Sequence, residues 1–296
     1  MLTFEDIGVS YKNGQAIHLG ASPLLLKVVE RLGIDELINE CCPSGQRKVS
    51  NGKAALVIVL SRLLNPKAMY KIEDWLRESG LETLLGLGAE KFYDDLLGRM
   101  MDVVSEQSEG LWVALIGRAF QAYPELVGCF IHYDVTSTYF EGEYVESLLA
   151  KRGYSRDHRS DAKQVNLGVS VFWESNFPVM YELLAGNQAD CKTPLSHIAK
   201  LKSLLETVKH TGKVIIVGDR AMFNRKLIAA YLSQDIEFLG PWTPSEVRTI
   251  VSEVEQAELL AHPLAFQPQL VPEDDPPTYY GVLRKVNFEY QGRYMS

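Results

Sequence analysis

The residues best suited to chemistry are two aspartates, Asp134 and Asp219. Asp134 follows the apolar run CFIHY and precedes the polar run VTSTYF, whereas Asp219 ends the continuous apolar run KVIIVGD. Ligands of open sheets packed with helices collect at the carboxyl ends of strands, which is where Asp219 is expected to lie. If the two strands are neighbours, these carboxylates, 219 − 134 = 85 residues apart, meet at one edge of the sheet.

Carboxylate oxygens without nitrogen or sulfur ligands suit Mg²⁺ or Mn²⁺. A site with two such ions roughly 3.5–4 Å apart activates a water or a 3′-hydroxyl and stabilises the leaving oxygen. Either aspartate alone is more simply explained as a turn residue or a helix cap. The prediction of a metal site therefore depends on the pair.

The elements before these aspartates are predicted to be helical. Over residues 1–125, apolar side chains recur at spacings of three and four, which is typical of amphipathic helices. One predicted helix starts at Ser22-Pro23, and another runs from Asn51-Gly52 to Asn65, where Pro66 stops it. Further helices are predicted for MYKIEDWLRES, FYDDLLGRMMDVVSEQ and EGLWVALIGRAFQAY. Their apolar stripes are interpreted as ordinary core packing.

The pattern changes at Pro124. The order predicted from there is three strands, a helix, a strand, a helix and a strand, which indicates a mixed sheet with helices packed on it. The fold class is therefore α/β (α+β). After this region PSEVRTIVSEVEQAELLA is predicted to be helical, HPLAFQPQLVPEDDPP to be a loop, and YYGVLRKVNFEYQGRYMS to be a strand or hairpin.

The charge balance does not by itself suggest nucleic acid. The formal net charge is −8, with 13 basic and 17 acidic groups in residues 1–126, 13 of each in 127–240, and 4 against 8 in 241–296. Because phosphate contacts need a local stripe of cations and not a positive average, the sum excludes little. No run of 18 apolar residues occurs and the start is acidic, which argues against a membrane span or signal peptide.

The cysteines fit neither a zinc site nor a secreted disulfide framework, so buried free thiols in a reducing cytosol are expected. They are Cys41, Cys42, Cys129 and Cys191.

Three segments carry a resemblance to a known family. YDVTSTYFEG, LLAGNQADCKTPL and VGDRAMFN, in this order, resemble the core of bacterial insertion-sequence DDE transposases of the insertion-sequence-four type, and FYDDLLGRMMD resembles the N-terminal domain of one subgroup. The resemblance covers nearly all of the chain. It implies a helical domain at residues 1–125 that binds transposon-end DNA, a ribonuclease-H-like core at 126–243, and the start of a β-rich insertion at 244–296.

The resemblance also implies an activity. Asp134 and Asp219 would be the first two members of a catalytic triad of acids that holds Mg²⁺ or Mn²⁺. The reaction would be hydrolytic nicking of DNA followed by strand transfer. The partner would be double-stranded DNA, as terminal repeats and as target, at the nucleoid of a bacterial cytoplasm, and a homodimer is left open.

Four further residues are candidates for supporting roles. Thr136 lies two residues after Asp134 and would face the same side of a strand. Asn187 and Asp190 precede a predicted helix, where a cap or turn role is the simpler interpretation. Arg220 follows the second aspartate and suits a phosphate, although a surface salt bridge explains it equally well.

A basic cluster lies between the first two predicted strands. It is a candidate grip on the DNA backbone. Because Asp157 and Asp161 interleave with it, a solvated loop is the alternative. The cluster consists of Lys151, Arg152, Arg156, Arg159 and Lys163.

The sequence departs from the family at the third acid, which the family places in a helix as Tyr, two residues, Arg, three residues, Glu, six residues, Lys. The nearest imitation is Tyr280, Arg284 and Glu289, with intervals of three and four in a strand-like segment and no lysine at the required offset. We reject it as the third acid. We expect that this sequence ends before its catalytic helix and that it catalyses little or no transposition alone.

Three alternatives remain open. The chain could be a non-catalytic DNA-binding remnant of a transposase. It could be a metal-dependent nuclease with the same core, whose extra acid would have to be Glu141, Glu143 or Asp190; the odd offset of Glu141 from Asp134 turns it to the wrong side of a strand. It could also be a helical interaction protein, in which case Asp134 and Asp219 should lie far apart.

Overall fold

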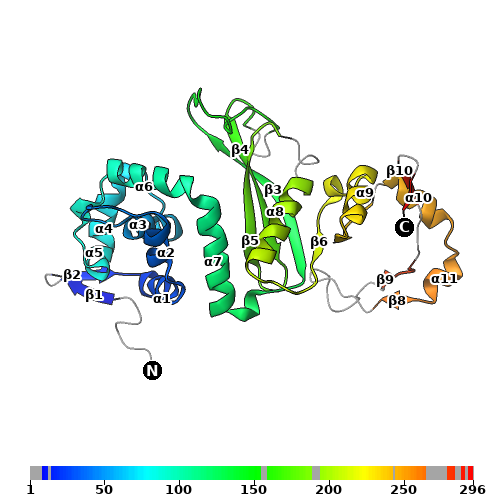
Figure 1. The fold of residues 1–296 in the computed structure, drawn as a ribbon, viewed down its shortest axis with the longest axis horizontal. Coiled ribbons are helices and arrows are strands. Elements are labelled where there is room, and N and C mark those ends of the chain that lie inside the picture. The colour runs from blue at the N-terminus through cyan, green and yellow to red at the C-terminus, as the bar shows by residue number, and fades with distance from the viewer. Residues whose placement is uncertain are drawn as a thin grey trace. The chain divides into compact units, whose positions relative to one another are not determined.

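The computed structural model describes residues 9–12, 15–154, 159–188, 194–242, 244–264, 279–283, 288–290 and 293–295. The chain divides into two compact units, one formed by Met1–Leu126 with Glu206–His210 and the other by Val127–Leu205 with Thr211–Ser296 (Figure 1). The division falls close to the predicted end of the helical region. The roles assigned to residues 1–125, 126–243 and 244–296 stay predictions.

The first unit is mostly helical, as its apolar spacing predicts. A two-stranded antiparallel hairpin of β1 and β2 precedes the helices, and this hairpin was not predicted. The elements are β1 Val9–Lys12, β2 Gln15–His18, α1 Ser22–Leu32, α2 Ile34–Cys41, α3 Asn51–Leu64, α4 Ile72–Ser79, α5 Leu81–Leu85, α6 Asp94–Glu106 and α7 Ser108–Ala122, with short 3-10 helices at Met69–Lys71, Ala89–Lys91 and Pro124–Leu126.

Helix α3 illustrates how local sequence sets an element. Ser50 is its N-cap, and the Ser50 side chain accepts a hydrogen bond from the backbone N–H of Lys53 at 3.3 Å. The helix ends at Leu64, because the residue before Pro66 is forced out of the helical region. Its apolar side chains, including Val57 and Leu60, are buried in the core of the unit. The apolar stripes of this unit therefore pack as core.

The second unit is built on a five-stranded mixed sheet with the order β5-β4-β3-β6-β7. Strands β3, β4 and β5 form an antiparallel meander, whereas β6 pairs parallel with β3, and β7 pairs parallel with β6. This is the mixed sheet of a ribonuclease-H-like fold, and the predicted fold class is confirmed. The elements are β3 Phe130–Phe140, β4 Lys163–Phe172, β5 Phe177–Ala185, α8 Pro194–Thr207, β6 Ile215–Val217, a 3-10 helix at Arg220–Met222, α9 Arg225–Ser233 and β7 Glu237–Leu239.

The central strand β3 has a buried and a more exposed face. Tyr133 and Val135 are buried, whereas Asp134 and Thr136 between them are exposed. On the buried face Tyr133 packs against the ring of His197 from α8, with centroids 4.2 Å apart. Helix α8 therefore covers one face of the sheet, and Asp134 belongs to the other.

The last described segments contain two helices and short strands. The predicted helical run is divided into α10 Pro244–Ser252 and α11 Gln256–Leu260. Strand β8 Pro263–Leu264 pairs with β9 Tyr279–Tyr280, and β10 Phe288–Tyr290 forms a hairpin with β11 Arg293–Met295. Among the described residues, no helix is both long enough and apolar enough to cross a membrane.

Candidate metal-binding site

The register between β3 and β6 sets the geometry of the candidate site. Phe130 pairs with Ile215, Ile131 with Ile216, and His132 with Val217, so every pair differs by 85 residues. Asp134 and Asp219 differ by the same 85, and each lies two residues beyond the last pair. Two residues of strand return a side chain to the same face. The two aspartates therefore follow the same row of two neighbouring parallel strands.

The backbone around each aspartate is held locally. Asp134 Oδ1 accepts a hydrogen bond from the N–H of Val135 at 2.7 Å, which orients the carboxyl group. The carbonyl of Asp219 accepts a hydrogen bond from the N–H of Met222 at 3.1 Å, which closes the turn after β6. The next helix, α9, starts immediately afterwards, because Asn224 Oδ1 caps the N–H of Leu227 at 3.0 Å.

Both aspartates are exposed, so their carboxylates are accessible to ions. Adjacent strands lie about 4.8 Å apart, which is a separation that one or two divalent ions can bridge. Mg²⁺ is commonly held by one or two carboxylates together with water and substrate phosphates. The pair therefore fits a Mg²⁺ or Mn²⁺ site that draws its other ligands from water and phosphate.

A buried polar cluster lies on the opposite face of β3, one residue away from Asp134. Ser170 pairs with Tyr133 across β3 and β4, and its Oγ lies 2.8 Å from His197 Nε2. His197 Nδ1 lies 3.5 Å from Glu182 Oε2 on β5, and Lys200 Nζ lies 2.6 Å from Glu182 Oε1. The cluster joins β3, β4, β5 and α8 beneath the candidate site.

Burial dominates the protonation of this cluster. His197 is fully buried, and this desolvation lowers its pKa to about 4, although Glu182 acts in the opposite direction. The histidine is therefore neutral at physiological pH. It was not singled out in the sequence, where a lone histidine in an amphipathic helix is typical of core packing.

Glu174, in the turn between β4 and β5, was also not singled out. Glu174 Oε1 accepts hydrogen bonds from the backbone N–H of Cys129 at 2.9 Å and of Phe130 at 3.3 Å, and from Cys129 Sγ at 3.1 Å. These bonds, led by that from the Cys129 N–H, lower the pKa of Glu174 to about 2. The prediction of buried thiols is wrong for Cys129, which is exposed and lies in this turn contact. Cys191 lies outside the described residues.

The predicted supporting residues are placed as follows. Thr136 is exposed and lies on the same face of β3 as Asp134. Asn187 is exposed in the turn after β5, which agrees with the turn interpretation, and Asp190 lies outside the described residues. Arg220 is exposed at the start of the 3-10 helix that follows Asp219.

The basic cluster is largely engaged with its own loop. Arg159 forms a two-pronged contact with Asp161, with both Nε–Oδ1 and Nη2–Oδ2 at 3.0 Å. Lys151 Nζ donates to the carbonyl of Ser147 at 3.0 Å, and Lys163 Nζ donates to backbone carbonyls of the preceding loop. Arg152 is exposed, and Arg156 and Asp157 lie outside the described residues.

The structure brings no third acid to the pair. Within the described part of the chain, no group of three or more histidine, cysteine, aspartate or glutamate side chains is arranged to hold a metal ion. Glu141 and Glu143 are exposed beyond the end of β3. Glu289 lies in strand β10, in keeping with its rejection, and Arg284 lies outside the described residues.

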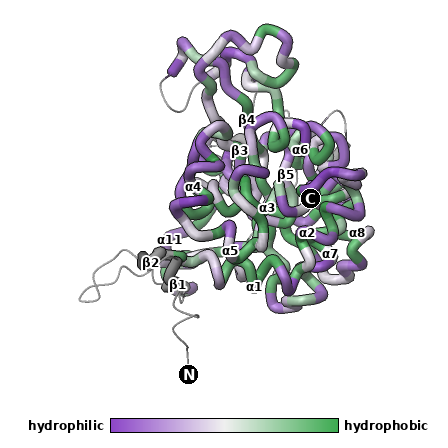
Figure 2. The backbone as a smooth tube through the Cα atoms, turned by 90° about the vertical axis from the view of Figure 1, so that its left-hand side faces the viewer, coloured by the Kyte–Doolittle hydropathy of each residue, from purple (hydrophilic) through white to green (hydrophobic). Residues whose placement is uncertain are grey.

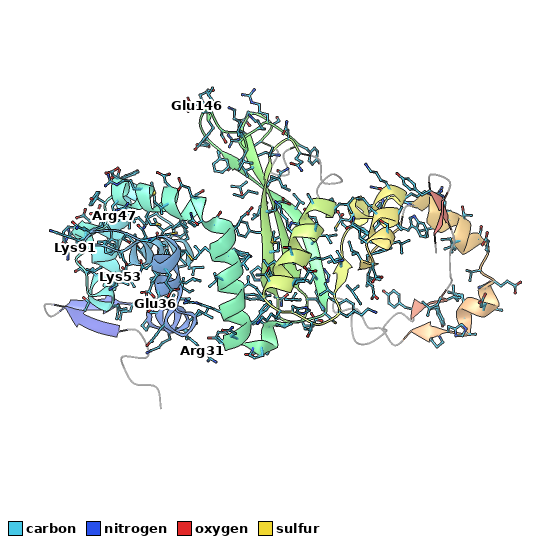
Figure 3. The ribbon with its side chains drawn as sticks, in the orientation of Figure 1. Arg31, Glu36, Arg47, Lys53, Lys91 and Glu146 are labelled. Carbon is cyan, nitrogen blue, oxygen red and sulfur yellow. The ribbon has the colours of Figure 1, made fainter. Side chains whose placement is uncertain are left out.

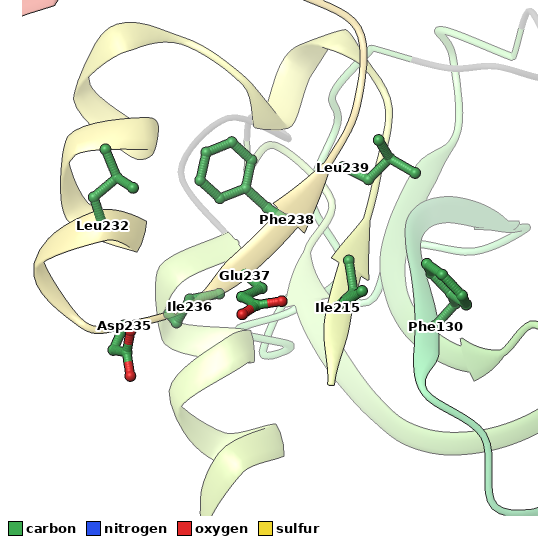
Figure 4. Close-up of a pocket in the computed structure, with 8 residues that line it drawn as sticks. All are labelled: Phe130, Ile215, Leu232, Asp235, Ile236, Glu237, Phe238 and Leu239. Atoms are coloured by element: carbon green, nitrogen blue, oxygen red, sulfur yellow. The ribbon is translucent and has the colours of Figure 1, made fainter. Parts of the chain in front are cut away.

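A pocket of about 510 Å³ lies at the other end of the sheet (Figure 4). Its lining includes Phe130, Ile215 and Glu237, which form one row at the starts of β3, β6 and β7. Since Asp219 follows the carboxyl end of β6, the pocket and the aspartate pair lie at opposite ends of the strands. The pocket is not part of the candidate metal site.

Comparisons with known proteins give one family match and several similar structures. A family model described as a domain of unknown function (DUF4277) matches residues 15–115. No curated protein sequence matches the chain.

The similar structures include two complexes of the Mos1 transposase and one of the piggyBac transposase. The Mos1 paired-end complex with left transposon end is 12% identical, with a TM-score of 0.28, over 73% of this chain and 75% of that one. The Mos1 mariner paired-end complex with Mn is 12% identical, with a TM-score of 0.26, over 79% and 84%. The piggyBac synaptic complex with hairpin DNA is 15% identical, with a TM-score of 0.39, over 79% of this chain and 54% of that one. These TM-scores are low, so the fold assignment rests on the order and direction of the strands.

Proposed function

We propose that this chain is a DDE-type transposase of a bacterial insertion sequence, in which Asp134 and Asp219 hold the divalent metal that acts on DNA. The observation that carries the proposal is the common offset of 85 residues, which aligns both aspartates on neighbouring strands. The order of the three motifs around them supports the same family. A purely helical interaction protein, in which the two aspartates lie far apart, is disfavoured because their strands are hydrogen-bonded neighbours.

The proposed roles follow from position. When bound, Mg²⁺ or Mn²⁺ would polarise a phosphodiester and activate the attacking oxygen. Asp134 and Asp219 would hold the ions, Thr136 would line the same face, and Arg220 would contact a phosphate beside Asp219. Of the basic cluster, Arg152 is the described member for which the structure gives an exposed side chain without a recorded loop contact. We propose residues 1–125 as the part that binds transposon ends.

Binding is an informative readout, because the third acid that the resemblance implies has no counterpart in the 296 residues. Two carboxylates repel phosphate when no cation lies between them and attract it through a shared cation when one does. We therefore expect Mg²⁺ or Mn²⁺ to tighten binding of duplex DNA to the chain, relative to the same ionic strength of NaCl with a chelator.

The matched variants should invert this pattern. Asp134→Asn and Asp219→Asn should bind DNA more tightly than the wild type in chelator and should lose the metal stimulation. Glu143→Gln removes one exposed carboxylate away from the pair, and it should keep the stimulation. Equal metal stimulation in all four proteins, measured by fluorescence anisotropy, would contradict the proposed site.

A further inference from the structure

Strands β3 and β4 continue beyond the candidate metal site into a projecting segment, which we call the arm and define as residues 139–154 and 159–163 (Figure 1). Phe140 ends β3 six residues after Asp134, so at about 3.3 Å per residue the strand runs roughly 20 Å past the aspartate. The arm is therefore a separate surface from the site.

The arm exposes a concentration of large apolar side chains. Val145, Leu148 and Tyr154 are 78%, 84% and 87% exposed. Tyr139, Tyr144 and Leu149 are also exposed. Figure 2 shows hydrophobic stretches among the hydrophilic ones in this part of the chain. A contiguous exposed apolar patch is typical of an interaction surface, whereas single exposed apolar residues are not.

These side chains are presented by a fixed backbone. Lys151 and Gln164 exchange both backbone hydrogen bonds, at 3.1 and 2.9 Å, and the N–H of Gly186 donates to the carbonyl of Leu149 at 2.9 Å. Gln164 Nε2 also donates to the carbonyl of Tyr154 at 2.9 Å. At Gly153 a Cβ atom would lie only 2.0 Å from the carbonyl oxygen of Gly186, so the close approach requires glycine. A surface held in this way loses little conformational entropy on binding.

The charges of the arm disfavour DNA as its partner. Lys151 and Lys163 spend their ammonium groups on carbonyls of the arm, and Arg159 is paired with Asp161. Glu141, Glu143 and Glu146 are exposed acids on the same surface, and Glu146 lies at the far end of the arm (Figure 3). Binding to a phosphate backbone needs available cations and is opposed by exposed carboxylates. An apolar patch flanked by both signs of charge suits a protein partner.

We propose that the partner is a second copy of this chain and that two copies associate arm against arm. A twofold interface is self-complementary, because residue i of one copy meets residue j of the other and the reverse also holds. The arm satisfies this requirement. Its apolar centre of Val145, Leu148 and Tyr154 can pack on itself, while Glu146 of each copy faces Arg152 of the other. Association of this kind does not depend on metal binding by the two aspartates.

The first test measures self-association of the full chain by analytical ultracentrifugation. The wild type should form dimers, and Leu148→Glu should weaken the dissociation constant at least tenfold, because two charges would be buried in the apolar centre. Val251→Glu is the matched control, since Val251 is 61% exposed on α10, away from the arm, and it should dimerise like the wild type. A monomeric wild type, or a Leu148→Glu dimer as strong as the wild-type dimer, overturns the proposal.

The second test exchanges charges. Glu146→Arg and Arg152→Glu should each weaken association, because like charges then face each other twice. An equimolar mixture of the two variants should regain a dimer, since both contacts of the mixed pair become opposite in sign. Circular dichroism should show all variants folded, because the changed side chains are exposed. A mixture that associates no better than either variant alone overturns the arm-to-arm arrangement. Loss of DNA affinity without any change in oligomeric state would assign the arm to DNA instead.

Discussion

Tyr133 and Asp134 are consecutive residues of β3, yet they lie on opposite faces of the sheet in contrasting surroundings. Tyr133 is buried above Ser170 and His197, in a cluster whose polar groups contact one another. Asp134 is exposed, and β6 brings Asp219 to the same row. On the buried face, polar side chains have partners within the fold, so stability explains them. On the exposed face, two carboxylates are aligned with no structural need for their proximity.

The comparison predicts that the two faces respond differently to substitution. Changes in the buried cluster should lower the free energy of unfolding and leave metal binding by the folded protein intact. Changes in the aspartate pair should do the reverse. Removing two like charges from neighbouring strands should not destabilise the fold.

The largest stability effect is expected for His197→Leu. The substitution leaves Glu182 and Ser170 without their buried partner, which should cost about 4 kcal/mol of unfolding free energy. Urea denaturation measures this loss. Lys200→Gln is the matched control, because Lys200 contacts the same Glu182 but is half exposed, and it should cost less than about 1 kcal/mol. Equal losses in the two variants would show that the cluster is not the stabilising element.

Acid should expose the same cluster through its titration. The pKa of His197 is about 4 in the folded chain against 6.5 in the unfolded chain, so the unfolded state binds the proton first as the pH falls. Stability should therefore be full above pH 6.5 and should decline towards pH 4, by roughly 3 kcal/mol in all. Glu174, with its pKa lowered to about 2, adds a separate loss as the pH falls through 4.5. If the decline between pH 6.5 and 4.5 is the same in His197→Leu as in the wild type, this assignment is wrong.

A smaller effect is expected at Asn224, the cap of α9 beside Asp219. Asn224→Ala removes the hydrogen bond to the N–H of Leu227 and should cost about 1 kcal/mol. Asn224→Asp keeps an acceptor at the cap and should restore most of it. Thermal unfolding distinguishes the two, and an alanine variant as stable as the wild type would rule out the cap as a support of this turn.

The smallest effect is expected at Thr136, which shares the exposed face with Asp134. Thr136→Val keeps the shape of the side chain and removes the hydroxyl, and should change stability by less than about 0.5 kcal/mol. Its effect on Mn²⁺ affinity, measured by electron paramagnetic resonance, should be much smaller than that of Asp134→Asn. Comparable losses would promote Thr136 from a supporting residue to a metal ligand.

Much of this fold could be predicted from the sequence because its periodicity is clear. The alternating strand that contains Asp134 and the continuous apolar strand before Asp219 differ visibly from the helical spacing of residues 1–125. The cap at Asn224 was also predictable, since its signal lies within four residues. The β1–β2 hairpin was not, because its strands are only four residues each and no apolar alternation marks them.

The candidate site could be predicted only in part. Strand ends could be located, but the register that aligns Asp134 with Asp219 depends on pairing between segments 85 residues apart. The partners of His197 come from β4 and β5, so no local spacing connects them. The loop contacts that occupy Lys151, Lys163 and Arg159 depend on the path of the arm, which composition does not encode.

The central claim is that one divalent ion is held by both aspartates, and iron-directed backbone cleavage tests it most directly. Fe²⁺ replaces the bound ion, and ascorbate with peroxide generates radicals that cut the chain only near the metal. The account predicts two sets of fragments, ending near residues 134 and 219, that vanish together in Asp134→Asn and in Asp219→Asn and persist in Glu143→Gln. Cleavage at one position alone, or cuts that survive both aspartate substitutions, would contradict it.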